Sequence, residues 1–363
     1  MIAQRKDDHV RLAVEQQQQH TGRNQFDEVS FVHHALAGLD RPDVSLATSF
    51  AGISWQVPLY INAMTGGSEK TGIINRDLAV AARETGVPIA SGSMSAYFKD
   101  PDCAGTFSVL REENPDGFVI ANVNATASVD KARRAVDLIQ ADALQIHVNT
   151  VQETVMPEGD RSFSSWVPQI GKIAAGVDVP VIVKEVGFGL SRETVRLLDG
   201  LGVRVADLGG RGGTDFARIE NGRRVLGDYA YLHGWGQSTA ACLLDAQDAR
   251  IPVLASGGVR NPLDVARALA LGASGVGVSG GFLRTLLDGG VAALIAQIST
   301  WLDQLAALQT MLGAPTPADL THCDLLIHGE LRDFCADRGI DTRPFARRSA
   351  GPDVPHEMTG STR

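Results

Sequence analysis

The sequence predicts an α/β fold, a closed TIM (β/α)8 barrel with an N-terminal extension and C-terminal helices. From residue 57 onward, a short apolar run, a glycine or polar residue and a helical pattern recur eight times. Most of the runs are continuously apolar rather than alternating, as expected for parallel strands buried on both faces. The 39 glycines suit a fold with many tight strand-to-helix turns.

The predicted strands, in chain order, are Pro58–Asn62, Val87–Ser91, Gly117–Asn122, Ala143–His147, Pro180–Glu185, Val203–Leu208, Pro252–Ser256 and Ser274–Ser279. Helical patterns are found between them at Val129–Ile139, Arg192–Leu201, Thr239–Gln247 and Asn261–Leu271. The last of these begins with Asn261-Pro262, an N-cap residue followed by proline at the first helical position.

Four segments are expected along the chain. Residues 1–56 form an N-terminal extension, residues 57–290 the barrel, residues 291–347 a helical region that packs on it, and residues 348–363 a disordered tail rich in Gly, Pro and Ser. Residues 209–235 form an unusually long connection after the sixth strand. Loops of such length are often lids, so this connection is expected to order only when a ligand binds.

Composition excludes several classes of protein. The net charge of -9 argues against a nucleic-acid partner, although a local basic cluster can still hold an anion. The charged N-terminus is unlike a secretory signal, and no run of 18 apolar residues predicts a membrane span. The four cysteines form no C-x-x-C pair, which weakens a zinc site and fits a reducing, cytoplasmic location.

Nearly every predicted strand ends on a polar or small residue. Active sites of barrels are built at this C-terminal face, so the strand ends predict a site there. The alternative, that polar residues simply end strands, is weaker for the whole set than for one strand. The end residues are Asn62, Ser91, Asn122, His147, Lys184, Gly209, Ser256 and Ser279.

The last two strands end in Ser256-Gly257-Gly258 and Ser279-Gly280-Gly281. Small residues let backbone N–H groups approach a phosphate, and a following helix N-terminus favours the anion. Barrels often bind phosphate at these two loops. The alternative is a pair of glycine turns without a ligand.

Met64-Thr65-Gly66-Gly67 after the first strand and Lys184 after the fifth indicate that the phosphate belongs to a flavin. A lysine near the pyrimidine end of the flavin ring stabilises negative charge there. The alternative for Lys184 is an ion pair with Glu185 or another acid.

Other polar clusters are individually ambiguous. His147, Asn149, Gln152 and Glu153 follow the fourth strand, where Glu153 has the chemistry of a Mg²⁺ ligand and Gln152 can hydrogen-bond a substrate. Arg5, Lys6 and His9 form a small cationic group that suits a diphosphate. Glu220 would place a second carboxylate on the mobile 209–235 connection. Each cluster has a non-functional alternative: a polar loop after the fourth strand, a solvated basic N-terminus, and a surface acid at position 220.

Taken together, the ordered motifs resemble the type 2 isopentenyl-diphosphate isomerases, over nearly all of residues 4–347. The matching strings are Arg5-Lys6-Asp7-Asp8-His9, Phe31-Val32-His33-His34, Met64-Thr65-Gly66-Gly67, Ala121-Asn122-Val123-Asn124-Ala125, Leu144 to Glu153, Met156 to Arg161, Val183-Lys184-Glu185-Val186-Gly187, Gly210 to Asn221, Ala255-Ser256-Gly257-Gly258 and Gly329-Glu330-Leu331. Each string alone is weak, but their order is specific.

The resemblance implies an FMN barrel that converts isopentenyl diphosphate into dimethylallyl diphosphate, with FMN active when reduced, NADPH as reductant, Mg²⁺ on the diphosphate, and a homotetramer or homooctamer. It implies substrate contacts at Arg5, Lys6, His9, Asn149 and Gln152, and Mg²⁺ at Glu153. It implies FMN contacts at Met64, Thr65, Gly66, Gly67, Ser91, Ser93, Asn122, Lys184, Thr214, Ser256, Gly257, Gly258, Ser279 and Gly280.

The catalytic candidates are Gln152, Glu153, Glu220 and His147. Reduced FMN would protonate the alkene, and the base at C2 would be the flavin N5 or Gln152 relaying to Glu153 or Glu220. Two rival functions remain: an oxidoreductase of the α-hydroxyacid oxidase or nitronate type, and a non-catalytic flavin- or phosphate-binding barrel. Net oxidation of a substrate, or tight diphosphate binding without turnover, would distinguish them.

Overall fold

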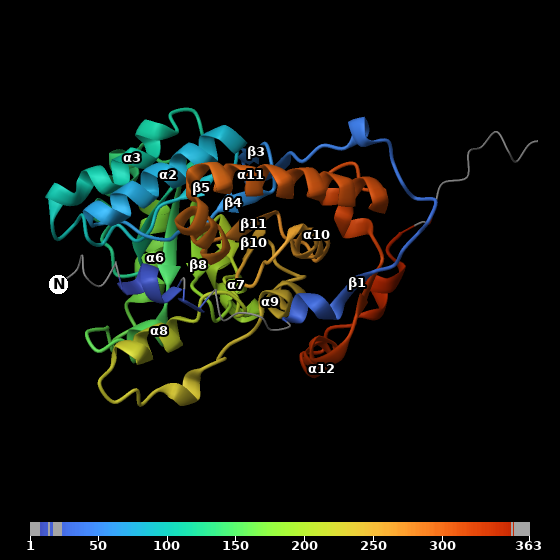
Figure 1. Cartoon of the computed structure of the whole chain (residues 1–363). Helices are drawn as coiled ribbons and strands as arrows, with labels where there is room; N and C mark the ends of the chain where they lie inside the picture. The colour runs from blue at the N-terminus through green and yellow to red at the C-terminus, as the bar shows by residue number, and fades with distance from the viewer. Residues whose placement is uncertain (1–7, 14, 17–23, 350, 352–363) are drawn as a thin grey trace, which may run out of the picture.

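The computed structural model describes residues 8–13, 15–16, 24–349 and 351. Its centre is a closed barrel of eight parallel strands that follow one another around the ring in chain order, with β11 pairing back to β4 (Figure 1). These strands are Leu59–Ile61 (β4), Ile89–Ala90 (β5), Val119–Asn124 (β6), Ala143–Val148 (β7), Val181–Glu185 (β8), Val205–Asp207 (β9), Val253–Ser256 (β10) and Gly275–Val278 (β11). Each overlaps its predicted run, so the barrel prediction is confirmed.

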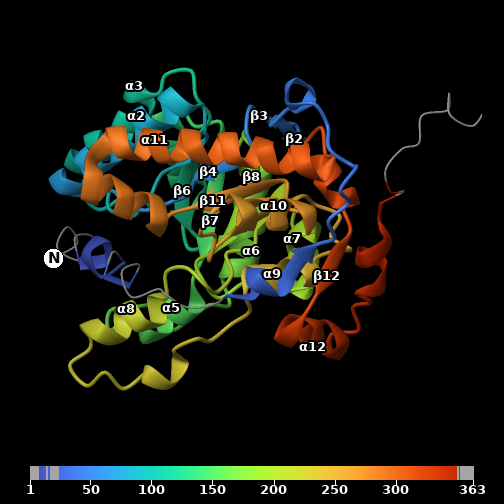
Figure 2. The same ribbon diagram turned by 45° about the vertical axis from the view of Figure 1, so that its right-hand side comes forward.

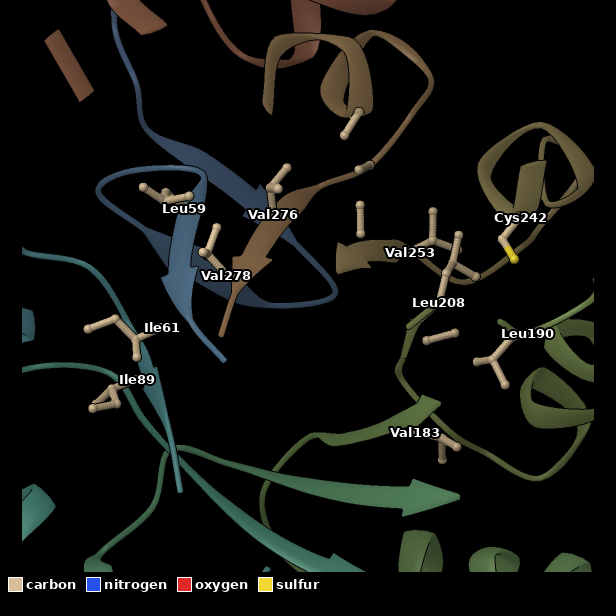
Figure 3. Close-up of a cluster of buried hydrophobic side chains, with 14 of the residues drawn as sticks. Leu59, Ile61, Ile89, Val183, Leu190, Leu208, Cys242, Val253, Val276 and Val278 are labelled. Carbon is tan, nitrogen blue, oxygen red and sulfur yellow. The ribbon is translucent and has the colours of Figure 1, made fainter. Parts of the chain in front are cut away.

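Two hydrophobic layers explain why the strands are apolar throughout. Successive side chains of a strand point to opposite faces. The outward ones, such as Leu59, Ile61 and Val183, join the surrounding helices in the main core, part of which is drawn in Figure 3. A separate inner core contains Ile182 and Leu254. Apolar side chains therefore cover both faces of the strands, except toward their C-terminal ends.

The inner core is closed at one end and polar at the other. The hairpin of Thr48–Phe50 (β2) and Ile53–Trp55 (β3) packs Trp55 against the inner core beside Gly275, the first residue of β11. Toward the C-terminal ends of the strands, the inward positions become polar. They include Asn62, Asn122, Gln145, His147, Lys184, Asp207 and Ser256.

The helices surround the barrel. They are Glu69–Thr85 (α2), Gly105–Glu113 (α3), Val129–Ile139 (α4), Thr150–Val155 (α5), Trp166–Gly176 (α6), Arg192–Gly200 (α7), Phe216–Arg223 (α8), Thr239–Asp245 (α9), Pro262–Ala270 (α10), Gly280–Leu312 (α11) and Gly329–Asp337 (α12). Ser128, Ser191 and Asn261 cap α4, α7 and α10 by accepting a backbone N–H, as Ser, Thr, Asp and Asn do at helix starts. The four predicted helices are confirmed within two residues at each end.

The connection after β9 differs from its prediction. Residues 209–235 contain α8 and a 3₁₀ turn at Ala230–Leu232, and α8 packs on α5 (Figure 2). The connection therefore contains a packed helix that was not predicted. The helix was missed because it is short and includes Asn221-Gly222, residues with low helix propensity.

The long helix α11 runs across residue 290, where the sequence placed a boundary. Gly290 has a non-helical backbone that joins two helical stretches, and α11 packs on α2 and α10. By length and composition α11 is apolar enough to span a membrane, which the sequence analysis did not foresee. Core helices of soluble proteins pass the same test, so this property carries no conclusion.

The C-terminal region is not all helical. Leu325–Ile327 (β12) pairs antiparallel with Val29–Phe31 (β1), a strand from the N-terminal extension. The Glu28 carboxylate accepts the backbone N–H of Leu331 in the first turn of α12. These contacts join the two ends of the described chain beside the barrel. The predicted disordered tail lies largely outside the described residues.

Candidate active site

A cavity of about 390 Å³ opens at the C-terminal ends of the barrel strands. Its walls come from the loops after several strands and from His9 near the N-terminus. Sixteen of the residues proposed from the sequence line it: His9, Met64, Thr65, Ser93, Asn122, His147, Asn149, Gln152, Glu153, Lys184, Thr214, Ser256, Gly257, Gly258, Ser279 and Gly280. The barrel therefore brings together groups that are up to 271 residues apart in sequence, from His9 to Gly280.

Six proposed residues are placed elsewhere. Arg5 and Lys6 lie outside the described residues. Gly66 and Gly67 pack behind the cavity, where a Cβ on Gly66 would come within 2.2 Å of the Phe107 ring. Ser91 and Glu220 are buried next to the lining residues but do not line the cavity themselves.

Glycines form one wall of the cavity. A Cβ on Gly257, which has a φ of +95°, would lie 2.0 Å from the carbonyl oxygen of Gly210. Beside this wall, α11 begins at Gly280, and its N-cap Ser279 makes no side-chain capping bond. The first N–H groups of α11 therefore remain available at the cavity, together with the positive end of the helix dipole. This is the chemistry that binds a phosphate.

Three buried polar atoms on or after β4, β5 and β7 have no partner among the described residues. They are Thr65 Oγ1, Ser91 Oγ and Gln145 Nε2. Buried polar groups normally make hydrogen bonds, so each one indicates a missing polar partner. A ligand with a phosphate and a heterocyclic ring, such as FMN, has the acceptors and donors that these groups need. The residues present fit that group.

A first polar cluster, here called the lysine cluster, consists of Tyr60, Asn62, Lys184, Asp207 and Ser256. Lys184 Nζ donates to Ser256 Oγ at 3.0 Å and lies 3.4 Å from Asp207 Oδ2. Lys184 is therefore paired with an acid, as the sequence alternative held, but the acid is Asp207. Lys184 also lines the cavity, so the ion pair and a role toward a ligand are compatible.

Glu185 is occupied elsewhere. Its carboxylate accepts the backbone N–H groups of Gly187, Phe188 and Gly189, and thus fixes the loop after β8. Burial raises the pKa of Glu185 to about 7, although these three hydrogen bonds act in the opposite direction.

A second cluster, here called the carboxamide cluster, consists of His9, Asn149, Gln152, Glu153 and Glu220. Gln152 Nε2 donates to Glu220 Oε1 at 2.9 Å, and Gln152 Oε1 accepts from Asn149 at 3.1 Å. His9 Nε2 lies 2.9 Å from the same Glu220 oxygen. The amide of Gln152 therefore has a fixed orientation between a donor and a carboxylate.

Glu220 is the carboxylate of this cluster that Gln152 contacts directly. It is fully buried on α8, so its predicted position on a mobile lid is wrong. Burial raises its pKa, but contacts with His9, Gln152 and Arg223 outweigh burial, and the pKa lies below its ordinary value. Glu220 is accordingly ionised at neutral pH.

The Glu153 carboxylate is not hydrogen-bonded to Gln152 and has hydrogen-bond partners of its own. Its Oε1 accepts from Asn149 and its Oε2 from the backbone N–H of Asp160 at 2.8 Å. In the described part of the chain, no group of three or more His, Cys, Asp or Glu side chains is arranged to hold a metal. A metal here would have one carboxylate from the protein and would take its other ligands from substrate and water, as Mg²⁺ does.

His147 faces another side chain of the barrel. Its Nδ1 lies 2.7 Å from Asn122 Oδ1, and Asn122 Nδ2 donates to Gln145 Oε1 at 2.8 Å. This chain of contacts orients both cavity-lining side chains. Gln145 and Asp207 were not predicted from the sequence, although each is a polar residue inside a predicted apolar strand.

The chain is similar to known proteins both in sequence and in fold. A family model described as FMN-dependent dehydrogenase matches residues 111–326, more than half of the chain. The chain is 79% identical to an isopentenyl-diphosphate delta-isomerase of Streptomyces sp. (strain CL190) over 99% of both chains. It is 64% identical to the protein of the same name from Nocardia farcinica (strain IFM 10152), over 96% of this chain and 97% of the other.

Among solved structures, a flavocytochrome b2 variant with benzoylformate superposes with a TM-score of 0.63. The match covers 94% of this chain and 83% of that chain at 19% identity. A mandelate oxidase variant with an FMN adduct gives a TM-score of 0.59 at 17% identity, over 88% of this chain and 92% of the other. At such identities the likeness is one of fold.

Proposed function

The chain belongs to the isopentenyl-diphosphate delta-isomerase family of type 2, and we infer that it interconverts isopentenyl diphosphate and dimethylallyl diphosphate with FMN in the barrel mouth. The observation that supports this function is the 79% identity to an isopentenyl-diphosphate delta-isomerase over 99% of the chain, combined with a cavity at the barrel's C-terminal face. The oxidoreductase rival has less support: the matching family model is described as FMN-dependent dehydrogenase, but the oxidoreductase structures share only the fold, at below 20% identity.

FMN would be held by the residues that line or back the glycine wall. Gly257, Gly258, Ser279 and Gly280 would cradle its phosphate, while Lys184 would meet the electron-rich end of the ring. Thr65 and Ser91 would supply hydrogen bonds from hydroxyls that lack a partner among the described residues. When bound and reduced, with NADPH as the proposed reductant, FMN supplies an acidic proton and a polarisable face for a cationic transition state.

The carboxamide cluster would handle the proton that leaves C2. Of the two carboxylates that the sequence offered to Gln152, Glu220 is the one that Gln152 contacts directly. A proton would be taken at Gln152 Oε1 while another passes from Nε2 to Glu220 Oε1. Because Glu220 is ionised and buried, it can accept that proton without competition from water.

The substrate diphosphate and Mg²⁺ would bind on the side of the carboxamide cluster formed by Asn149 and Glu153. The diphosphate would contact His9 and Asn149, and Arg5 and Lys6 by the family resemblance. Glu153 would bind Mg²⁺ with one carboxylate oxygen and leave the other positions to diphosphate oxygens and water.

Self-association to a tetramer or octamer is also proposed. Support for it comes from the family resemblance, which implies a homotetramer or homooctamer. Light scattering of the purified protein tests this, and a monomer at micromolar concentration would contradict it.

The function is tested by an anaerobic assay that contains the protein, FMN, NADPH or dithionite, Mg²⁺ and isopentenyl diphosphate in D₂O. The expected result is dimethylallyl diphosphate that carries deuterium, formed only with reduced FMN and without stoichiometric use of NADPH. Consumption of NADPH in proportion to an oxidised or reduced product would instead support the oxidoreductase rival. Tight binding of diphosphate without turnover would support a non-catalytic barrel.

A further inference from the structure

Asp207 is a buried carboxylate for which the proposed reaction gives no task. It ends β9, is fully buried, and does not line the cavity. Burying a carboxylate without partners is costly, so its surroundings must compensate the charge. Its contacts come from three strands besides its own.

Both carboxylate oxygens are saturated. Oδ2 accepts from Tyr60 Oη at 2.6 Å and from Asn62 Nδ2 at 3.1 Å, and Oδ1 accepts from Ser256 Oγ at 2.6 Å. The pKa of Tyr60 is raised well above its usual value, first by burial and then by the Asp207 charge, so Tyr60 remains a donor. The barrel makes room for this arrangement at Gly277, where a Cβ would lie 2.6 Å from the Tyr60 ring.

Two routes connect this carboxylate to the cavity, and both end at Lys184. One is direct, since Lys184 Nζ lies 3.4 Å from Asp207 Oδ2. The other passes through Ser256, which receives a hydrogen bond from Lys184 and donates one to Asp207. Lys184 and Asp207 are also paired residues of the neighbouring strands β8 and β9, so their side chains lie on the same face. The cavity is lined by the lysine and the serine, and the acid lies behind them.

We propose that Asp207 is a positioning residue of the flavin site: its carboxylate holds Lys184 and Ser256 toward the cavity and offsets the charge that Lys184 presents to the flavin. The proposal rests on the proposed placement of FMN beside Lys184. Oxidised FMN has a neutral ring, whereas the reduced ring carries negative charge in its anionic form. The net charge of the lysine cluster therefore sets the ratio between the dissociation constants of oxidised and reduced FMN.

The test compares Asp207→Asn with Lys184→Met in the full-length apoprotein, titrated with oxidised FMN in air and with reduced FMN without oxygen. Lys184→Met removes the cation, so the ratio of Kd(oxidised) to Kd(reduced) should fall by about tenfold. Asp207→Asn removes the offsetting anion, so the ratio should rise by about tenfold. A role limited to holding the barrel together predicts no such opposition, and a ratio that falls or stays unchanged in Asp207→Asn overturns the proposal.

A further variant separates the effect of charge from a loosening of the site. Tyr60→Phe removes a donor to the same carboxylate without changing any charge, and the ratio should stay within about twofold of the native value. If Tyr60→Phe raises it as far as Asp207→Asn does, loosening rather than charge is responsible and the proposal fails.

If Asp207→Asn does not fold, the double variant Lys184→Met/Asp207→Asn replaces it, because it leaves no unpaired buried charge in the cluster. Its ratio should be about tenfold above that of Lys184→Met, and equality would overturn the proposal. Failure of the proposed FMN site gives a different result: the native chain then binds neither form of FMN, or Lys184→Met leaves the ratio unchanged.

Discussion

The lysine cluster and the carboxamide cluster flank one cavity but are built differently. Lys184, Asp207 and Ser256 stand on adjacent parallel strands, where the ladder of backbone hydrogen bonds fixes their spacing. The carboxamide cluster gathers its members from α5 and its N-cap Asn149, the helix α8 and the N-terminal segment. The first is fixed by the barrel itself, while the second depends on how separate elements pack.

This difference suits the two tasks proposed for the clusters. A flavin site needs an invariable frame of small residues and one well-placed charge. A proton-handling site needs groups whose ionisation is tuned by neighbours, and the contacts of Glu220 with His9 and Arg223 provide such tuning. We therefore expect changes in the carboxamide cluster to reduce turnover without loss of FMN, and changes in the glycine wall to do the reverse.

The largest effect is expected for Gln152→Ala and Glu220→Gln. Gln152→Ala removes the hydrogen bond to Glu220, and Glu220→Gln replaces the proton-accepting carboxylate with a neutral amide, so in each kcat should fall by roughly 10²–10⁴-fold while FMN affinity stays native. Initial rates under anaerobic conditions and FMN titration measure the two quantities. Asp228→Asn, which removes an exposed carboxylate of the same connection, serves as a matched control and should retain the native rate. Full turnover in Gln152→Ala would exclude its part in proton transfer.

A smaller effect, on the cofactor, is expected for Gly257→Ala. The added Cβ would meet the Gly210 carbonyl, and the φ of +95° disfavours alanine, so FMN affinity should fall by roughly 10–100-fold. Saturating FMN should restore much of the rate. Gly105→Ala is the control, because nothing lies within 4 Å of its Cβ position. Native FMN affinity in Gly257→Ala would mean that this wall does not contact the cofactor.

The next largest effect is expected on the Mg²⁺ concentration that activity requires. Glu153→Gln removes the single carboxylate proposed for Mg²⁺, so the Mg²⁺ concentration for half-maximal rate should rise about tenfold or more. Excess Mg²⁺ should recover activity, and FMN binding should not respond. An unaltered Mg²⁺ dependence would place the metal on the diphosphate alone.

The smallest effect concerns pH. The pKa of Glu220 lies below its ordinary value, so the ionised form persists in mild acid and activity is lost only as pH falls through that lowered pKa. Arg223→Gln removes one cause of the lowering and should move the acidic limb of kcat upward, by about one pH unit at most. A limb that does not move would mean that Glu220 is not the titrating group.

The fold could be predicted from sequence because a barrel repeats a local signal. Eight apolar runs end in polar or small residues, and burial on two faces makes each run recognisable without knowing its neighbours. The same rule placed six strand-end residues around one cavity, while separate motifs and the family resemblance supplied the other predicted lining residues; the six are Asn122, His147, Lys184, Gly209, Ser256 and Ser279. Helix caps such as Asn261-Pro262 were predictable for a similar reason, since their hydrogen bonds are made within four residues.

What the sequence missed depends on contacts between distant segments. Asp207 was passed over because its pairing with Lys184, Tyr60 and Ser256 exists only once the strands stand side by side. Glu220 was placed on a mobile lid because nothing local reveals that α8 packs on α5 and buries it. The strand β12 was missed because its partner, β1, lies about 300 residues earlier in the chain.

The sequence by itself thus determined the barrel, the face that carries the site and the residue types available there, because these follow from local periodicity and strand-end chemistry. Only the tertiary structure decided which charges are paired, which carboxylate Gln152 contacts and which glycines face the cavity rather than the core. Electrostatic and hydrogen-bond energies depend on distances of a few ångströms between side chains, and chain folding sets those distances across hundreds of residues.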